Sequence, residues 1–92
     1  MSPVVEAEVV IRNRLGLHAR PAAAFVKAAN RYHSEIAVRA DDLQVNGKSI
    51  MGVMMLGAPL GARLFLKAEG EDAEALIREL VQLVDNKFNE DS

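Results

Sequence analysis

Apolar residues recur with one period in some segments of this chain and with another period elsewhere, and these two periods constrain the fold more than any other feature. Apolar side chains recur at every second position in residues 4–11, 35–40 and 62–68, which is typical of half-buried β-strands. In residues 72–88 they recur three and four positions apart, which predicts an amphipathic helix. A chain of 92 residues forms one compact domain, so we treat residues 1–92 as a single domain in which these elements pack together.

Residues 19–30 are rich in alanine and favour a further helix, whose start is set by a proline. Pro21 has no backbone N–H and disrupts a helix interior, but it fits the first turn. The helix is therefore expected to begin very close to His18. Its apolar face would contain Ala22, Phe25, Val26 and Ala29.

The residues after the strand at 35–40 allow two interpretations. A short strand is expected at 43–45, and the Asn46-Gly47 pair that follows is a strong hairpin signal. The next residues do not alternate like a strand, and Ser49 could instead cap a short helix at 50–56. With that helix the order is β-α-β-β-α-β-α, which predicts an α+β domain with its helices on one face of the sheet.

Composition and hydropathy exclude several classes of protein. The chain has no cysteine, which excludes a disulfide scaffold, a thiol nucleophile and a thiolate metal site. The formal net charge of −2 gives no general reason to bind nucleic acid or an acidic membrane. The longest strictly apolar run, Ala22–Val26, has five residues, whereas roughly 20 are needed to span a bilayer. The first residues lack the pattern of a secretory signal, so we expect a cytoplasmic protein without membrane insertion.

The net charge conceals an uneven distribution along the chain. Residues 1–68 hold nine basic and five acidic residues, a net charge of +4. Residues 69–92 hold two basic and eight acidic residues, a net charge of −6. A solvated acidic terminal helix would explain this pattern without any function. Alternatively, the basic part, which includes Arg12, Arg14 and Arg20, docks briefly onto an acidic partner.

The most informative stretch is residues 16–23, which read GLHARPAA. His18 would lie just before the helix, where free backbone N–H groups and the partial positive charge of the helix bind phosphate without a metal. That environment favours the neutral ring, which has a nucleophilic nitrogen. The backbone at Ala19 and Arg20, together with the Arg20 side chain, would form a phosphate cradle. A single histidine at a helix start is often only a cap or a surface residue, so spacing alone leaves both interpretations open.

Two blocks of the sequence resemble a known family. Residues 16–22 (GLHARPA) are similar to the active-site signature of HPr, the phosphocarrier of the bacterial phosphoenolpyruvate-dependent phosphotransferase system. Residues 48–54 (KSIMGVM) are similar to the regulatory-serine segment of that family, and the similarity covers about residues 4–88. The resemblance implies an open-faced β-sandwich, with four antiparallel strands and three helices on one side. It also implies a short helix after Ser49 rather than a hairpin.

The resemblance also implies a chemical role for the histidine. By position, His18 would accept a phosphoryl group on Nδ1 from the phosphohistidine of enzyme I and pass it to EIIA-type domains. Arg20 matches the active-site arginine of the family. We expect a monomer without cofactor or metal, acting as a phosphotransferase component rather than a stand-alone enzyme. Sugar uptake is the expected pathway, although residues 11–16 are more similar to the nitrogen-related paralogue NPr and leave that pathway open.

Ser49 has two compatible roles. Its hydroxyl can cap the short helix by accepting a backbone N–H, which stabilises a helix by about 1 kcal/mol. The resemblance implies that the same serine is phosphorylated by HPr kinase/phosphorylase. A phosphate there would lie at a helix N-terminus, where its charge is tolerated, and would add negative charge to the surface used by partners.

The short helix carries three of the four methionines in the chain. A helix this short must bury one side, so some of them fill the core. Flexible methionine side chains also suit a surface that accepts several partners in turn. The resemblance implies a docking patch of this kind beside the active site. The residues that we expect to contact partners are Met51, Met54, Lys27 and Leu17.

Other functions compete with the relay. A regulatory interaction module of the same fold, similar to NPr or Crh, would bind partners according to the phosphorylation state of His18 or Ser49. A hydrolase with His18 as general base lacks a second catalytic group, because residues 12–21 contain no Ser, Asp or Glu. Nucleic-acid binding is disfavoured, because the chain lacks the aromatic side chains on which bases stack. His33 has no second ligand at a spacing typical of a metal site.

Overall fold

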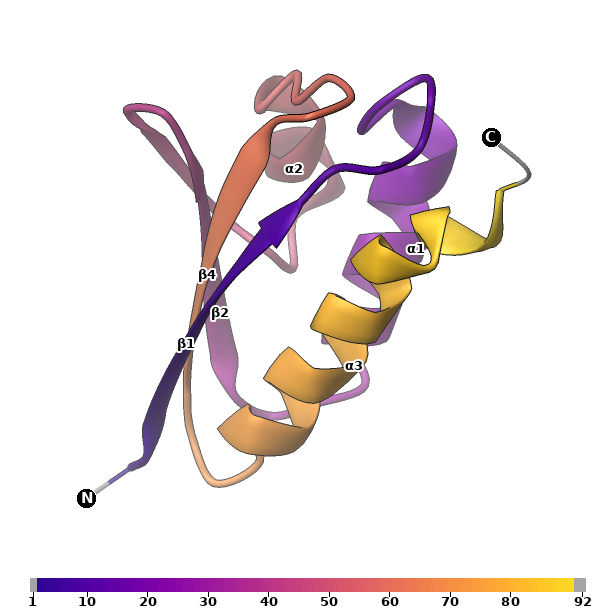
Figure 1. Cartoon of the computed structure of the whole chain (residues 1–92). Helices are drawn as coiled ribbons and strands as arrows, with labels where there is room; N and C mark the ends of the chain where they lie inside the picture. Colours follow the sequence, from indigo (N-terminus) through magenta and orange to yellow (C-terminus); the bar gives the residue numbers. More distant parts are fainter. Residues whose placement is uncertain (1, 91–92) are drawn as a thin grey trace.

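The computed structural model describes residues 2–90, which form a four-stranded antiparallel sheet covered on one face by three α-helices (Figure 1). The order of elements confirms the predicted β-α-β-β-α-β-α arrangement and adds a 3-10 turn after the last helix. The strands are β1 (Val4–Val10), β2 (Glu35–Ala40), β3 (Leu43–Asn46) and β4 (Arg63–Glu69). The helices are α1 (Ala19–Ala29), α2 (Ile50–Met55), α3 (Ala73–Asp85) and the 3-10 turn η1 (Lys87–Asn89).

The sheet has the strand order β1-β4-β2-β3, so the first and the last strand of the chain are neighbours. Val9 of β1 is paired with Leu64 of β4, and both side chains are buried under the helices. Alternate residues point to the opposite face, where the Arg39 guanidinium lies 4.3 Å from the centre of the Phe65 ring. The period of two in the strands therefore separates a buried face from an open one.

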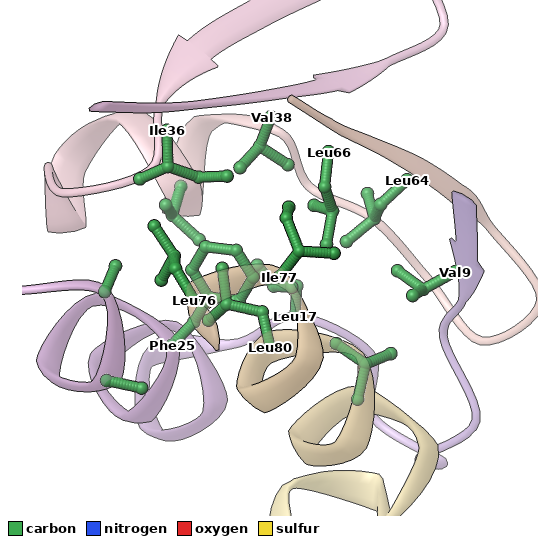
Figure 2. Packing of buried hydrophobic residues seen from close by; sticks show 14 of the residues in the cluster. Val9, Leu17, Phe25, Ile36, Val38, Leu64, Leu66, Leu76, Ile77 and Leu80 are labelled. Atoms are coloured by element: carbon green, nitrogen blue, oxygen red, sulfur yellow. The ribbon is translucent and has the colours of Figure 1, made fainter. Parts of the chain in front are cut away.

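The core lies between the sheet and the helices, as Figure 2 shows. Phe25 of α1 and Leu76 and Leu80 of α3 are buried in one cluster with Leu64 and Leu66 of β4. Aliphatic side chains make up most of this cluster, in keeping with the scarcity of aromatic residues.

The predicted apolar face of α1 faces the core, because Ala22, Phe25 and Ala29 are buried and Val26 packs against the core cluster. Val26 is only partly buried at the rim of the core, whereas Ala28 is buried. The burial of Ala28 widens the apolar face beyond the predicted residues, because α1 contacts both α2 and α3.

The segment at Asn46-Gly47 is not a hairpin turn. The Gly47 N–H donates to the carbonyl of Ile36 at 2.8 Å, and the chain then turns into α2. Ser49 caps this helix, because its hydroxyl oxygen accepts the Gly52 N–H at 3.1 Å. The prediction of a short helix capped by Ser49 is confirmed.

Asp72, the residue before α3, anchors that helix to the loop before β2. Its carboxylate accepts hydrogen bonds from the Ser34 hydroxyl and from the backbone N–H groups of His33 and Ser34. These hydrogen bonds lower the pKa of the Asp72 carboxyl from 3.8 to about 2, and the bond from the Ser34 hydroxyl has the largest effect. His33 thus contributes to the fold through its backbone.

The last helix is shorter than the predicted 72–88, because α3 ends at Asp85. Asp85 and Asn86 are poor helix formers, and Lys87, Phe88 and Asn89 have positive φ angles of 57°, 55° and 63°. This left-handed turn is held by the buried Phe88 side chain and by a hydrogen bond from the Asn89 N–H to the Asn86 carbonyl at 2.9 Å. Asn89 and Glu90 belong to this turn and its C-cap, and residues 1 and 91–92 lie outside the described part.

Candidate functional site

His18 lies at the end of the loop that follows β1, immediately before α1 (Figure 1). Its backbone is extended, with φ −77° and ψ −173°, as is usual for a residue at the N-cap. Its side chain makes no capping hydrogen bond, so the ring does not occupy the free N–H groups of the helix. The side chain is 35% exposed, which gives a partner access to part of the ring.

The loop before His18 is held by hydrogen bonds and by a glycine. Asn13 Nδ2 donates to the Gly16 carbonyl at 2.7 Å, and the Leu17 N–H donates to the Ala58 carbonyl at 2.8 Å. Gly16 has a φ angle of +71°, and a Cβ at this position would lie 2.5 Å from the Ala58 oxygen. Both the backbone conformation and the close approach therefore require glycine here.

Glu90 is the residue of this site that sequence reasoning missed. The left-handed turn after α3 brings its side chain to the His18 ring, where Oε2 lies 3.1 Å and Oε1 3.4 Å from Nε2. Asn13 Nδ2 also donates to Glu90 Oε1 at 3.1 Å, so a buried amide holds the carboxylate in place. Because Glu90 and His18 are 72 residues apart, no local pattern connects them. The one sequence feature that indicated a buried segment after α3 was Phe88, an apolar residue two positions after the weak helix former Asn86.

This contact fixes how the His18 ring is protonated. An ionised carboxylate can only accept hydrogen bonds, so Nε2 must donate and carry a proton. In the neutral ring, Nδ1 then holds the free electron pair. Among the described residues Nδ1 has no hydrogen-bond partner, which leaves it available as a nucleophile.

The start of α1 has free backbone N–H groups at the positions where the sequence analysis predicts a phosphate cradle. The Ala22 N–H donates to the His18 carbonyl at 3.0 Å, and Pro21 has no N–H to offer. The backbone N–H groups of Ala19 and Arg20 are left without a partner inside the helix. The Arg20 side chain is exposed and forms no ion pair within residues 2–90. These groups can receive an oxyanion beside the ring.

The basic residues predicted around this loop divide into two kinds. Arg12 lies 3.7 Å from the Asp85 carboxylate at the end of α3, so it links the loop to the acidic helix. Arg14, Arg20 and Lys27 are exposed, and none of them is in an ion pair with the described residues. Their charge is therefore available to a partner.

Leu15, Met51, Met55 and Leu60 are exposed apolar residues of the His18 loop, of α2 and of the loop after α2, and we call this set the apolar rim. Met51 is 70% exposed and Leu15 is 72% exposed, although the sequence analysis named only Met51 of these four. Met54 is also exposed, but less so. The hydrogen bond between Leu17 and Ala58 joins the His18 loop to the loop after α2, and both loops lie at the same end of the molecule as α2 (Figure 1).

Leu17, predicted as a docking residue, is a core residue instead. Only 5% of it is exposed, because its side chain belongs to the cluster of buried hydrophobic residues (Figure 2). Leu15, two residues earlier, is the exposed leucine of this loop, as had been predicted for Leu17. A loop has no regular period, so the sequence could not distinguish the two.

Residues 2–90 contain neither a metal-binding cluster nor a helix that could span a membrane. No group of three or more His, Asp or Glu side chains in this part of the chain is arranged to hold a metal ion. None of the helices there is both long enough and apolar enough to cross a bilayer.

Comparison with known proteins assigns the chain to a family. The family model described as the PTS HPr component phosphorylation site matches residues 5–86. The chain belongs to the HPr family of phosphocarriers of the phosphotransferase system. Its four-stranded antiparallel sheet with three helices is the fold of that family.

Individual HPr proteins match over nearly their whole length. The phosphocarrier protein HPr of Treponema pallidum is 46% identical over 88 residues, which cover 96% of this chain and 100% of that protein. The HPr of Pseudomonas aeruginosa is 49% identical over 84 residues, covering 90% and 93%. The crystal structure of HPr-C-His from Thermoanaerobacter tengcongensis matches with a TM-score of 0.91 at 48% identity, covering 96% and 99%.

Proposed function

We propose that this chain carries a phosphoryl group on Nδ1 of His18, which it accepts from enzyme I and delivers to an EIIA-type domain in the cytoplasm. The observation that carries the proposal is the contact between His18 Nε2 and the Glu90 carboxylate at 3.1 Å. It keeps the proton on Nε2 and leaves the electron pair of Nδ1 free. The family of the chain supports the same chemistry.

The transfer step exchanges one nitrogen–phosphorus bond for another. The electron pair of Nδ1 attacks the phosphorus of the phosphohistidine on enzyme I, and the bond from that phosphorus to the donor ring breaks. The electron pair of the broken bond returns to the donor ring. The charge on the phosphoryl oxygens is stabilised by the free N–H groups of Ala19 and Arg20 and by the Arg20 guanidinium.

Docking would use the apolar rim and the unpaired cations beside it. Met51 and Lys27, both exposed, would contact the donor and the acceptor in turn, since both partners must reach the same ring. Unpaired Arg14 and Arg20 favour partners with an acidic surface. Long methionine side chains adapt to surfaces of different shape.

Phosphorylation of Ser49 by HPr kinase/phosphorylase would regulate this docking. The Ser49 oxygen already accepts the Gly52 N–H, and a phosphoryl group could keep that contact at the start of α2. The helix would stay folded, while about two negative charges would be placed two residues before Met51. Repulsion of an acidic partner is the expected effect.

The proposal is tested by incubating the protein with enzyme I and labelled phosphoenolpyruvate. The expected result is an acid-labile label that is lost in His18→Ala and retained in His33→Ala, the matched control for the other histidine. Ser49→Asp should accept the label more slowly, because it places a charge near the docking surface. Absence of label on the wild type, or label that survives His18→Ala, would refute the proposal.

A further inference from the structure

We infer that Met51 and Met55 form an oxidation-sensitive modification site, at which a peroxide makes part of the docking surface polar and so weakens the contact with partners. The inference rests on the proposed function, because it assumes that the apolar rim contacts enzyme I and the acceptor domain. It goes further in assigning a covalent modification, and the chemical class of its agent, to two side chains of that rim.

Sulfur in this chain occurs only in methionine. The sequence has no cysteine and four methionines, and three of these, Met51, Met54 and Met55, lie in α2. Met1 lies outside the described part. Thiols and thioethers are the side chains that peroxides oxidise in steps that cells reverse. Within residues 2–90, reversible oxidation of this kind is therefore restricted to α2, which lies at the same end of the molecule as the His18 loop (Figure 1).

The three methionines of α2 differ in their exposure. Met51 is 70% exposed and Met55 is 66% exposed, whereas Met54 is 42% exposed. None of them belongs to the hydrophobic core cluster, to which α2 contributes Val53. Met51 and Met55 are four positions apart in the helix, so they share one face of it. A dissolved oxidant therefore has access to both side chains without any opening of the fold.

The modification is a two-electron oxidation of the thioether. An electron pair of the sulfur attacks one oxygen of hydrogen peroxide, and a sulfur–oxygen bond forms as the oxygen–oxygen bond breaks. The proton of the transferred hydroxyl goes to the departing hydroxide, so the products are methionine sulfoxide and water. Methionine sulfoxide reductases restore the thioether with electrons from a dithiol, which becomes a disulfide, and the oxygen leaves as water.

Oxidation changes the surface and leaves the fold intact. A sulfoxide is polar, whereas the thioether is apolar and adapts to surfaces of different shape. In a docked complex the new oxygen loses its water without gaining a donor, which lowers affinity by roughly tenfold or more. The fold does not depend on these side chains, because Val53 is the buried residue of α2 and the Ser49 oxygen caps the helix.

The first experiment determines where oxidation occurs. The protein is treated with hydrogen peroxide, samples are taken at intervals, and peptides are analysed by tandem mass spectrometry. Met51 and Met55 should gain an oxygen atom faster than Met54, in the order of their exposure. Equal rates at the three positions, or faster oxidation of Met54, would overturn the assignment of the site.

The second experiment measures docking after the peroxide has been removed. KM and kcat for phosphoryl transfer from enzyme I are determined for the treated and the untreated protein. In the wild type we expect KM to rise by roughly tenfold or more, with kcat and the melting temperature unchanged. Treatment with both classes of methionine sulfoxide reductase, one for each sulfoxide epimer, should restore the original KM.

Matched variants assign the effect to the two methionines. Leucine is apolar and does not react with peroxide, so we compare the double variant Met51→Leu/Met55→Leu with the control Met54→Leu. The ratio of KM after treatment to KM before treatment is formed for each variant against its own untreated sample, which removes any change in basal docking. This ratio should fall close to unity in the double variant and stay raised in Met54→Leu.

The outcomes distinguish the inference from the proposed function. If the oxidised wild type keeps the KM of the untreated protein, or if the double variant is equally sensitive, the inference is refuted while the relay stands. A melting temperature that falls on oxidation would also overturn it, because the effect would then be on the fold. If the untreated wild type accepts no label, the relay fails and the docking consequence fails with it, whereas the order of oxidation still tests the modification site.

Discussion

Replacement of Gly16 by alanine should destabilise the protein far more than the same replacement at Gly57. Both glycines have left-handed backbones, with φ angles of +71° and +56°, so alanine costs about 1–2 kcal/mol at either position. They differ in the space around the added methyl group. At Gly57 a Cβ would meet nothing within 4 Å, whereas at Gly16 it would lie 2.5 Å from the Ala58 oxygen and 2.9 Å from Pro59 Cα.

The magnitude of the difference follows from the backbone shift that Gly16→Ala requires. Ordinary contact begins at 3.4 Å, so the two loops must separate by nearly 1 Å. Overpacking of this kind costs about 1–3 kcal/mol beyond the conformational term. For a domain of this size, 1 kcal/mol corresponds to about 4–8 °C in Tm. We therefore expect Gly16→Ala to melt roughly 5–20 °C below Gly57→Ala.

Thermal and urea unfolding followed by circular dichroism give both values, and unchanged m-values would show that the same transition is compared. The rate at which His18 accepts the phosphoryl group is a second assay. His18 lies two residues after Gly16, so a backbone shift at Gly16 also displaces the histidine. A displacement of 1 Å can slow such a step about 100-fold. If Gly16→Ala were as stable and as active as Gly57→Ala, the requirement for glycine at position 16 would be refuted.

Two predictions concern the helix starts. The pKa of Asp72 is lowered from 3.8 to about 2 by its bonds to Ser34 and His33, so the stability that its charge provides is complete above about pH 4 and is lost as pH falls through 2. The free energies of unfolding of wild type and Asp72→Asn should therefore converge between pH 4 and pH 2, and a constant difference would contradict this. Ser49→Ala removes the acceptor of the Gly52 N–H and should lower the free energy of unfolding by about 1 kcal/mol in urea titrations. Ser49→Asp retains a capping oxygen and should lose clearly less, so equal losses in the two variants would argue against the cap.

The parts of the fold that sequence could predict are those set by local chemistry. The periods of two and of 3.6 indicated the strands and the long helix, and Pro21 located the start of α1 within one turn. Ser49 was correctly read as a cap, because the need for an acceptor at a helix start is independent of the rest of the fold. The position of His18 before α1 follows from the same local signals.

The parts that sequence could not predict depend on contacts between distant segments. Glu90 reaches His18 only because three residues turn left-handed, and no propensity favours Phe88 in that conformation. The burial of Leu17 in place of Leu15 depends on how the loop lies against Ala58. The site therefore combines a predictable nucleophile with a counter-charge that only the tertiary structure reveals.

The central position of β4 has a consequence for the order in which this protein can be assembled. β4 is hydrogen-bonded to both β1 and β2, yet it is the last strand to leave the ribosome. Until then β1 has no neighbouring strand in the described sheet, so the His18 loop follows an unpaired strand. Pairing between such distant segments is slow compared with helix formation. A partly synthesised chain thus has the histidine without a formed site, so phosphoryl acceptance reports that the whole domain has folded.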